Sequence, residues 1–309
     1  MRIVRHYRNA PDSVKGAVIA LGNFDGVHRG HRALIAEAGR IARAGQRPLA
    51  AMIFEPYPRE YFQRSAQPFR LTSFRSKAAL LADAGIDILF VIKFDAETAG
   101  MLAQDFVMEI LVRDLAAAHV VVGEDFRFGK GRGGDTAVLA YMGAMEGFGV
   151  TVFPAVVEGG EKISSSNIRA ALQGGRPDLA ARMLGHPWTV TGRVAHGDAR
   201  GRTLGYPTAN LRLKHNLLQP KFGVYAVRAR HRDRQYGGAA NFGLRPMFAA
   251  DAPLLEVYLF DFSGNLYGEQ LQVEFVEWLR GEMRFPDVEE LKTQMAADCA
   301  EARRLLSQH

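Results

Sequence analysis

Two histidines three residues apart, His28 and His31, lie in the stretch Gly22–His31, which reads GNFDGVHRGH. In the first turn of a helix, side chains at this spacing project from the same face. Their ring N–H groups can donate hydrogen bonds to phosphate oxygens whose negative charge grows in a transition state. No side chain of the stretch is placed to act as a covalent nucleophile, so the residues indicate stabilisation of a phosphate rather than covalent catalysis.

The elements on either side of this stretch indicate how it is held. An apolar run at 17–21 predicts a strand, and the next segment predicts an amphipathic helix whose apolar stripe is Leu34, Ile35, Ala38, Ile41 and Ala42. A helix N-terminus attracts anions, and a glycine in its first turn has no side chain to block a phosphate. Two surface histidines beside a glycine turn are the alternative. The candidate nucleotide-binding residues are Gly22, Phe24, Asp25 and Gly30.

A second glycine-rich stretch, Gly123–Gly134 (GEDFRFGKGRGG), follows a predicted strand at 119–122. Glycines make the loop pliant, its basic residues provide positive charge, and Phe126 and Phe128 offer faces on which a ring can stack. Its position after a strand favours a ligand site. A flexible surface loop that has collected arginines by chance is the alternative.

Three serines, Ser164, Ser165 and Ser166, precede a predicted helix and can cap its N-terminus. With Arg169 one turn into the helix, they can also form a second phosphate cradle. The candidates are Ser165, Ser166 and Arg169. Capping alone is the alternative, but the histidines favour a nucleotide held from two sides. The loop 54–58 (FEPYP) can line the same crevice.

The C-terminal half contains a third candidate phosphate site. A glycine-rich loop can surround phosphates with backbone N–H groups, and its candidate contacts here are Gly197, Arg202 and Thr203. Thr208 and Asn210 supply hard oxygen atoms of the kind that Mg²⁺ prefers, and Pro207 fixes the turn that presents them. A strand end with a tight turn is the alternative.

Length and composition limit the class of protein. A chain of 309 residues can form two domains, each with its own core, and 48% hydrophobic with 23% charged residues is typical of a globular protein. The net charge of +6 and the pI of about 9.5 suit anionic ligands, but no block of like charge predicts a nucleic-acid arm. The single cysteine, Cys299, excludes an intrachain disulfide and a cysteine-built zinc site. Without a signal peptide or a membrane-spanning run, we expect a cytoplasmic protein.

Strands and helices are predicted to alternate in the first half of the chain. The strands are expected at 17–21, 48–54, 86–94, 119–122 and 150–154, and the helices after the histidine stretch and at 72–84, 97–115 and 135–147. This order predicts a parallel sheet with helices on both faces, which binds ligands beyond the carboxyl ends of its strands. Two prolines, Pro56 and Pro58, predict a loop after the second strand, and two short helical pieces end near 184.

The pattern changes at Gly185, His186 and Pro187. Strand-length segments joined by Gly, Asn and Asp turns follow at 188–195, 223–230, 236–241, 254–262 and 270–277. A last helix, 288–306, has an inner face of Val288, Leu291, Met295, Ala302 and Leu305. We therefore predict two domains, 1–186 with the parallel sheet and 187–309 with an antiparallel barrel that the last helix closes.

Four stretches, GNFDGVHRGH, FEPYP, GEDFRFGKGRGG and ISSSNIR, occur in an order that resembles the FMN adenylyltransferase module of bacterial bifunctional riboflavin kinase/FAD synthetases. The second domain resembles riboflavin kinase over Gly192–Leu211, around its PTAN sequence. The resemblance covers nearly the whole chain. It implies an α/β nucleotidyltransferase domain with a Rossmann-like parallel sheet, followed by an antiparallel β-barrel with a closing α-helix.

The resemblance also implies roles for individual residues. His28 and His31 would contact the ATP phosphates and stabilise the transfer of AMP to FMN, with pyrophosphate leaving. Glu256 matches the base assigned to the kinase reaction in the family, although by sequence alone it is an exposed strand carboxylate. The candidate flavin-binding residues are Asp125, Phe126, Phe128, Arg280, Glu282 and Phe285.

We therefore expect an enzyme that phosphorylates riboflavin to FMN and then adenylates FMN to FAD, with ATP as co-substrate and Mg²⁺ as cofactor. Its partners would be riboflavin, FMN, FAD and ATP, with no nucleic acid, no membrane and at most a weak homo-oligomer. The alternatives are an adenylyltransferase whose barrel only binds flavin, and a non-enzymatic nucleotide or RNA binder. Tyr258 and Met247 stand where the family often has histidine and threonine, which bears on the efficiency of the kinase.

Overall fold

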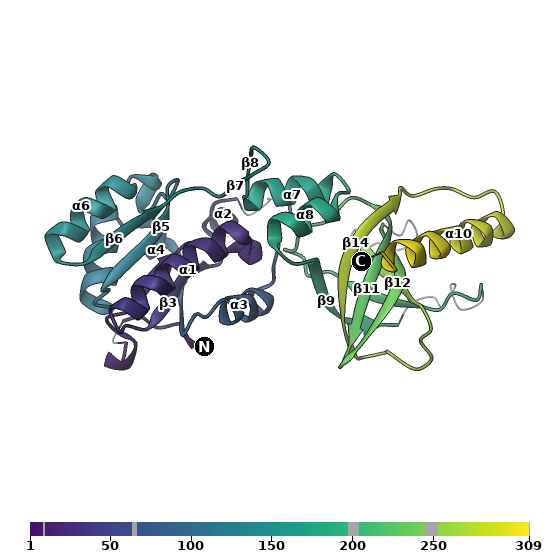
Figure 1. Cartoon of the computed structure of the whole chain (residues 1–309), viewed down its shortest axis with the longest axis horizontal. Helices are drawn as coiled ribbons and strands as arrows, with labels where there is room; N and C mark the ends of the chain where they lie inside the picture. The colour runs from purple at the N-terminus through teal and green to yellow at the C-terminus, as the bar shows by residue number, and fades with distance from the viewer. Residues whose placement is uncertain (9, 64–66, 197–203, 245–252, 309) are drawn as a thin grey trace. The chain divides into compact units, whose positions relative to one another are not determined.

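The computed structural model describes residues 1–308 of the chain except 9, 64–66, 197–203 and 245–252 (Figure 1). The candidate phosphate contacts Gly197, Arg202 and Thr203 therefore lie outside the described residues, as does Met247. Two compact units are found. The first comprises Met1–Gln67 and Thr72–Ser164, and the second comprises Pro68–Leu71 and Ser165–His309.

A parallel six-stranded sheet forms the centre of the first unit, with the strand order β1-β4-β3-β2-β5-β6 (Figure 1). The strands are β1 (Arg2–Val4), β2 (Val18–Leu21), β3 (Leu49–Glu55), β4 (Ile88–Lys93), β5 (His119–Gly123) and β6 (Gly149–Phe153). The predicted parallel sheet is confirmed. Only β1 is missing from the sequence prediction, because three residues are too few to show a period.

The strand order places the two glycine-containing loops next to each other in the sheet. The chain adds β3 and β4 on one side of β2, and then β5 and β6 on the other side. Open α/β sheets bind ligands at the carboxyl ends of the strands where the order reverses in this way. The stretches Gly22–His31 and Gly123–Gly134 leave the sheet at these ends of β2 and β5.

Helical segments cover both faces of the sheet, because successive side chains of a strand point to opposite faces. One core contains Ile19, Met52, Phe90 and Val122 together with residues of η3 (Phe106–Asp114) and α6 (Thr136–Glu146). The other contains Ala20, Ile53, Val91 and Val121 together with residues of α1 (Arg29–Ala44) and α3 (Phe74–Asp83). In α1 the predicted stripe is confirmed, with four residues buried and Ile41 partly buried.

The single helix predicted at 97–115 is wrong. The chain forms α4 (Ala96–Gly100), an extended step at Met101 and Leu102, α5 (Ala103–Asp105) and the π-helix η3. The break has a tertiary cause, because the carbonyl oxygen of Met101 accepts a 2.7 Å hydrogen bond from the backbone N–H of Lys130 in the second glycine-rich loop. Helical periodicity cannot report such a contact.

Another difference concerns the two prolines after β3, which predict a loop. Pro58 instead begins the short helix α2 (Pro58–Phe62), where its missing N–H is not needed. The prediction of a loop is right only for Pro56 and Tyr57. A small hairpin, β7 (Val157–Glu158) and β8 (Glu161–Lys162), completes the first unit.

In the second unit, two helices precede a closed antiparallel barrel (Figure 1). The helices are α7 (Ser165–Gln173) and α8 (Pro177–Leu184), and the barrel strands are β9 (Trp188–Ala195), β10 (Thr208–Arg212), β11 (Gly223–His231), β12 (Arg234–Gly243), β13 (Leu254–Leu259) and β14 (Gln270–Arg280). They close in the order β10-β13-β12-β11-β14-β9. The predicted barrel is confirmed; the strand pattern omits β10, which the sequence places in a candidate metal-binding turn.

The last helix, α10 (Val288–Leu306), packs on the barrel as predicted (Figure 1). Ala302 is fully buried in a cluster with Ala226, Ala239 and Phe260. Val288 does not belong to the inner face, since it is 52% exposed. The first turn of the helix extends beyond the packed part, so its apolar residue is not covered. Among the described residues, no helix is long and apolar enough to cross a membrane.

Candidate active sites

The turn between β2 and α1 has an unusual backbone. Phe24 (φ 49°), Gly26 (φ 82°) and Val27 (φ 44°) all lie in the left-handed region. For a β-branched residue such as Val27 this conformation is a genuine outlier, and strained residues of this kind occur at ligand and active sites. The surrounding structure must therefore hold the turn in place.

Asp25 stabilises the turn through hydrogen bonds of its side chain. Its side chain is only 3% exposed, and its Oδ1 atom accepts hydrogen bonds from the backbone N–H (3.2 Å) and the hydroxyl (3.3 Å) of Thr72. The Thr72 hydroxyl oxygen also accepts a hydrogen bond from the Gly26 N–H at 3.2 Å. The geometry thus gives Asp25 a part in shaping the turn, in addition to its place among the candidate nucleotide contacts.

His28 caps α1, and its ring orientation is fixed by that role. Its Nδ1 atom accepts a 3.2 Å hydrogen bond from the backbone N–H of His31, and its side chain is buried. In the neutral ring the proton must then be on Nε2, which becomes the donor. The rings of His28 and His31 stack with centroids 3.5 Å apart, and Phe24 lies edge-on to His31 at 5.2 Å. The structure brings both predicted histidines together at the helix N-terminus.

The two glycines of this turn differ in their steric role. A Cβ atom at Gly30 would lie 3.2 Å from two atoms of the His28 ring, whereas one at Gly22 would make ordinary contact with the Phe24 ring at 3.5 Å. Gly30 therefore makes room for the capping histidine itself. The expectation that it only clears the path of a phosphate missed this contact, because spacing in the sequence does not show where the ring turns.

Two glycines of the second glycine-rich loop are closely packed. Gly129 and Gly134 lie against Ala103, where added Cβ atoms would come within 2.7 Å of backbone or side-chain atoms. Phe128 is 6% exposed and belongs to the core, while Phe126 stacks on it at 5.5 Å and is only partly buried. Of the two aromatic candidates, Phe126 thus has the more accessible ring.

Asp125, the acidic candidate of this loop, is paired with a cation. Lys162 of the β7–β8 hairpin donates a 2.8 Å hydrogen bond to its Oδ2 atom. This contact lowers the pKa of the exposed Asp125 carboxyl, although partial burial opposes the shift. The same hairpin reaches the histidine turn through an ion pair between Glu158 and Arg29. Lys162 therefore offsets the negative charge of Asp125, which would otherwise disfavour the anionic ligand that the sequence predicts here.

Three aromatic rings outside the motifs, those of Phe62, Phe94 and Phe106, join the motif residues Phe54 and Phe128 at the ends of β3, β4 and β5. Phe54 contacts Phe94 (6.0 Å) and Phe106 (6.1 Å), and Phe106 contacts Phe128 (5.6 Å). At the other end, Phe94 contacts Phe62, which is 66% exposed. Scattered phenylalanines read as core residues in the sequence, so only the sheet topology could show that they form one row along the ligand-binding edge.

Ser165, Ser166 and Arg169, the residues of the second cradle, belong to the second unit. The start of α7 at Ser165 confirms the predicted helix. The Nε atom of Arg169 donates a 2.7 Å hydrogen bond to the carbonyl oxygen of Phe69, and the guanidinium lies 5.3 Å from the Phe69 ring centroid. Their approach to the histidines of the first unit stays a prediction.

A cavity of about 1050 Å³ in the second unit collects most of the kinase candidates. The candidates that line it are Thr208, Asn210, Glu256, Arg280, Glu282 and Phe285, together with Tyr258. They come from β10, β13, β14 and the segment before α10. The structure thus assembles residues that are up to 77 positions apart in the chain, from Thr208 to Phe285.

Three polar residues form a row across neighbouring strands of the barrel. Glu256 on β13 is directly opposite Asn210 on β10 and opposite Asn241 on β12. Directly opposed residues of an antiparallel pair project from the same face, and all three line the cavity. Asn241 was not a sequence candidate, because a lone asparagine in a predicted strand carries no motif.

Arg280, Glu282 and Phe285 lie at the end of β14 and in the segment that leads to α10. Arg280 donates hydrogen bonds to both carboxylate oxygens of the buried Asp298, at 2.9 and 2.7 Å, and its guanidinium lies 5.8 Å from the Phe285 ring centroid. A Cβ atom at Gly243 would clash with the Glu282 carboxylate. The segment after β14 is therefore fixed to the closing helix through a bidentate ion pair.

No group of three His, Cys, Asp or Glu side chains within the described residues could hold a metal ion. The oxygen donors of Thr208 and Asn210 instead lie on one strand and line one cavity. A hydroxyl and an amide oxygen are hard donors, and Mg²⁺ commonly takes few protein ligands and completes its shell with phosphates and water. The donor set therefore fits Mg²⁺ bound together with a nucleotide.

Comparison with known proteins gives two family matches along the chain. A family model described as FAD synthetase matches residues 10–167, and one described as riboflavin kinase matches residues 184–306. The bifunctional riboflavin kinase/FMN adenylyltransferase of Escherichia coli K12 is 42% identical over 305 residues, which are 98% of this chain and 97% of that protein. Its counterpart in Haemophilus influenzae is 40% identical, with 98% of each chain covered.

A solved structure has the same fold over nearly the whole chain. It is described as a macrolide-efflux protein from Streptococcus pneumoniae, with a TM-score of 0.86 and 30% sequence identity. The match covers 96% of this chain and 97% of that one. The same fold is therefore known from an experimentally solved protein.

Proposed function

This chain belongs to the family of bifunctional riboflavin kinase/FMN adenylyltransferases, and we propose that its two reactions take place at separate sites, one built around His28 and His31 of the first compact unit and the other in the barrel of the second. It phosphorylates riboflavin to FMN and transfers AMP from ATP to FMN, which gives FAD and pyrophosphate. The observation that carries the proposal is the cavity in the second unit, where Thr208, Asn210 and Glu256 converge while His28 and His31 lie in the first unit.

In the kinase reaction, Glu256 accepts the proton of the riboflavin hydroxyl that attacks the γ-phosphorus of ATP, and ADP leaves. A positioned carboxylate suits this task, since positioning and charge stabilisation account for most of phosphoryl-transfer catalysis. Thr208 and Asn210 would hold Mg²⁺, which neutralises phosphate charge when bound. Arg280, Glu282 and Phe285 would close over the flavin and the nucleotide.

In adenylyl transfer, a phosphate oxygen of FMN attacks the α-phosphorus of ATP and pyrophosphate leaves. The attacking phosphate is already ionised near neutral pH, so this step needs no general base. The Nε2 proton of His28 and the ring of His31 stabilise the phosphate oxygens, and the N-terminus of α1 adds its partial positive charge. Gly22, Phe24, Asp25 and Gly30 shape the turn that presents these groups.

The flavin and phosphate contacts complete the proposed assignments. We place the flavin ring of FMN beside Phe126 and the aromatic row, with Asp125 near its phosphate and the nucleotide. Ser165, Ser166 and Arg169 form the second phosphate cradle, and Gly197, Arg202 and Thr203 contact the nucleotide of the kinase. We set the functional domains at 1–186 and 187–309, a division supported by family matches that end at 167 and begin at 184.

A time course tests the function directly. Purified protein is incubated with riboflavin, ATP and Mg²⁺, and the flavins are separated by chromatography. We expect FMN first and FAD after it. FAD formed only from supplied FMN would favour the adenylyltransferase with a flavin-binding barrel, and RNA binding without turnover of either flavin would favour the binding protein.

The cellular setting is also a proposal. We expect a cytoplasmic enzyme that binds flavins and ATP, without a nucleic-acid or membrane partner and with at most weak self-association. Cell fractionation and light scattering over a range of protein concentrations measure these properties.

A further inference from the structure

Lys77 of α3 is the least exposed charged residue that the structure describes, at 0%. Its Nζ atom lies 3.4 Å from Oε1 of Glu55 and 4.2 Å from the centroid of the Tyr57 ring. A buried ammonium is costly unless it is paired, and an aromatic face contributes further attraction. Neither proposed reaction uses this lysine, so its position requires another explanation.

The position of Lys77 connects it with the ligand-binding edge of the sheet. Glu55 is the last residue of β3, at the carboxyl end, and its side chain is 16% exposed. It begins the segment Glu55–Phe62, which ends at the exposed ring of Phe62 beside Phe94. Lys77 thus contacts Glu55 and Tyr57, the first and third residues of this segment.

The helix that carries Lys77 is also tied to the histidine turn. Thr72, just before α3, binds Asp25 and Gly26, and Ser73 caps the helix by accepting a 3.1 Å hydrogen bond from the Ser76 N–H. One turn of helix thus separates the contacts to the histidine turn from the contacts to the Glu55–Phe62 segment. A change at Lys77 can therefore move the Glu55–Phe62 segment without breaking the contacts of Thr72 to the histidine turn.

We propose that Lys77 is a positioning residue for adenylyl transfer, whose buried ammonium holds Glu55 and Tyr57 so that the segment Glu55–Phe62 receives FMN. The inference rests on the proposed placement of adenylyl transfer at the turn that carries His28 and His31. Lys77 does not touch the reacting atoms. It acts through the segment, so its effect falls on the binding of FMN more than on the chemical step.

The test substitutes Lys77→Met and measures both reactions of the full chain. Methionine is nearly as long as lysine and removes the charge. Because removal of one partner of a buried ion pair is destabilising, the Tm of the variant is measured together with its kinetics. We expect the KM for FMN to rise roughly tenfold, because Glu55 loses its interaction with the Lys77 ammonium and the segment shifts. The KM for ATP in the same reaction and the riboflavin kinase rate should stay within about twofold.

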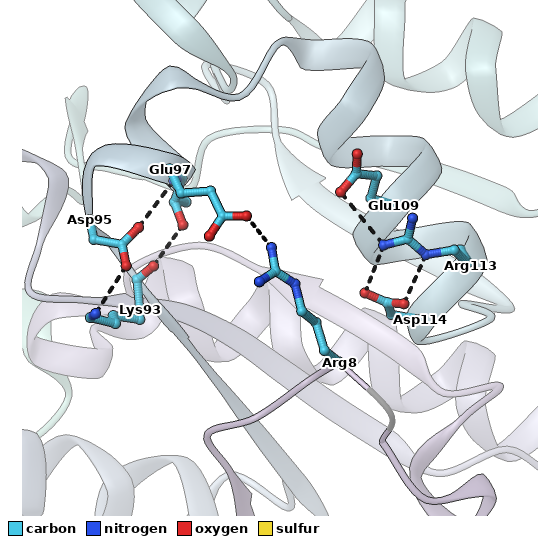
Figure 2. Close-up of polar contacts among 8 residues, drawn as sticks. Arg8, Lys93, Asp95, Glu97, Glu109, Arg113 and Asp114 are labelled. Atoms are coloured by element: carbon cyan, nitrogen blue, oxygen red, sulfur yellow. Dashed lines mark hydrogen bonds and ion pairs between the residues drawn. The ribbon is translucent and has the colours of Figure 1, made fainter.

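Lys93→Met is the matched control. Lys93 of β4 is the direct cross-strand partner of Glu55, but its side chain is 79% exposed and pairs with Asp95 at 3.1 Å (Figure 2). Exposed ion pairs of this kind contribute little. We therefore expect unchanged kinetics in this variant. An equal rise of the KM for FMN in both variants would overturn the proposal, since it would reflect only a change in surface charge.

Glu55→Gln and the double variant distinguish a positioning role of Lys77 from a role in stability alone. If Lys77 acts through Glu55, the single variants raise the KM for FMN to a similar extent and the double variant is no worse, because both remove the same interaction. Multiplicative effects would contradict this. A lower Tm with an unchanged KM for FMN would make Lys77 a structural residue only, and would overturn the proposal.

Two controls keep the experiment decisive. If Lys77→Met does not fold, Glu55→Gln alone decides, since its milder change must still raise the KM for FMN. Failure of the proposed function is recognised separately, because the unsubstituted protein would then make no FAD, or His31→Ala would leave FAD formation intact. With both controls as expected, an unaltered KM for FMN in Glu55→Gln and Lys77→Met refutes only the positioning role.

Discussion

The two proposed sites are built in opposite ways. The histidine site comes from ten consecutive residues. Its geometry depends on a turn with three residues in the left-handed region, which Thr72 stabilises through a hydrogen bond to Asp25. The kinase site takes its polar groups from several strands of a barrel, where neighbours across the sheet are distant in the chain. A local motif therefore identifies the first site, whereas strand register creates the second.

This contrast predicts how each site fails when it is changed. In the turn, one residue serves the shape and would also serve the chemistry: His28 caps α1 and has its Nε2 atom left for the proposed phosphate contact. In the barrel, backbone pairing supplies the shape, so that a polar residue can be replaced without disturbing the fold. Substitutions in the barrel should thus alter kinetics alone, and those in the turn should alter stability as well.

The largest expected effect is that of Glu256→Gln on FMN formation. Loss of a positioned general base lowers the rate by about 10²- to 10⁴-fold, and adenylyl transfer from supplied FMN should stay normal. Glu274→Gln is the matched control, because Glu274 is a partly buried barrel residue on β14 that does not line the cavity. A normal kinase rate in Glu256→Gln would show that Glu256 is not the base.

His31→Ala should give the converse result, with FAD formation reduced by roughly 10²- to 10³-fold, as for other donors to a developing charge, and FMN formation intact. His28→Ala should also lower stability by about 1 kcal/mol, since the helix loses its cap. The exposed His6 of the same unit provides the control His6→Ala. Equal loss of both reactions in His31→Ala would refute separate sites.

Cys299 reports on the cavity of the second unit through its reactivity. Burial, with a smaller effect of Asp298, raises the pKa of its thiol from 9.0 to about 11, and the residue lines the cavity. Since a raised pKa keeps the thiol protonated, alkylation at pH 9 should be roughly 50-fold slower than for a thiol of ordinary pKa. Denaturant should remove the difference. Equal alkylation rates in the native and unfolded protein would contradict the burial of the Cys299 thiol.

Asn241→Ala should have a smaller effect on the kinase, and it tests whether strand register brings Asn241 into the site. If Asn241 contacts the hydroxyl chain of riboflavin beside Glu256, the KM for riboflavin should rise about tenfold, the value of one or two lost hydrogen bonds. Lumiflavin, which lacks that chain, should inhibit the kinase with an unchanged inhibition constant. A parallel loss of lumiflavin inhibition would instead indicate that the cavity has changed shape.

Periodicity and motif order were sufficient for the architecture. Alternation of buried strands and helices identifies the parallel sheet, and the change of pattern after Gly185 identifies the barrel. The errors have two kinds of cause. The helix predicted at 97–115 ends early where the carbonyl oxygen of Met101 accepts a hydrogen bond from the backbone N–H of Lys130, a tertiary contact, whereas β10 escapes detection because its local pattern also fits a metal-binding turn.

By itself, the sequence determined which residues are candidates for the reacting groups and the order of the elements that carry them. Side-chain chemistry and helical spacing are local, so the histidine pair, the glycine loops and the oxygen donors of Thr208 and Asn210 could be found without coordinates. Only the tertiary structure decided which distant residues meet. The pairing of Lys162 with Asp125, the buried contact of Lys77 with Glu55, and the row of Asn210, Glu256 and Asn241 all depend on register and packing, which bring together residues that no local pattern relates.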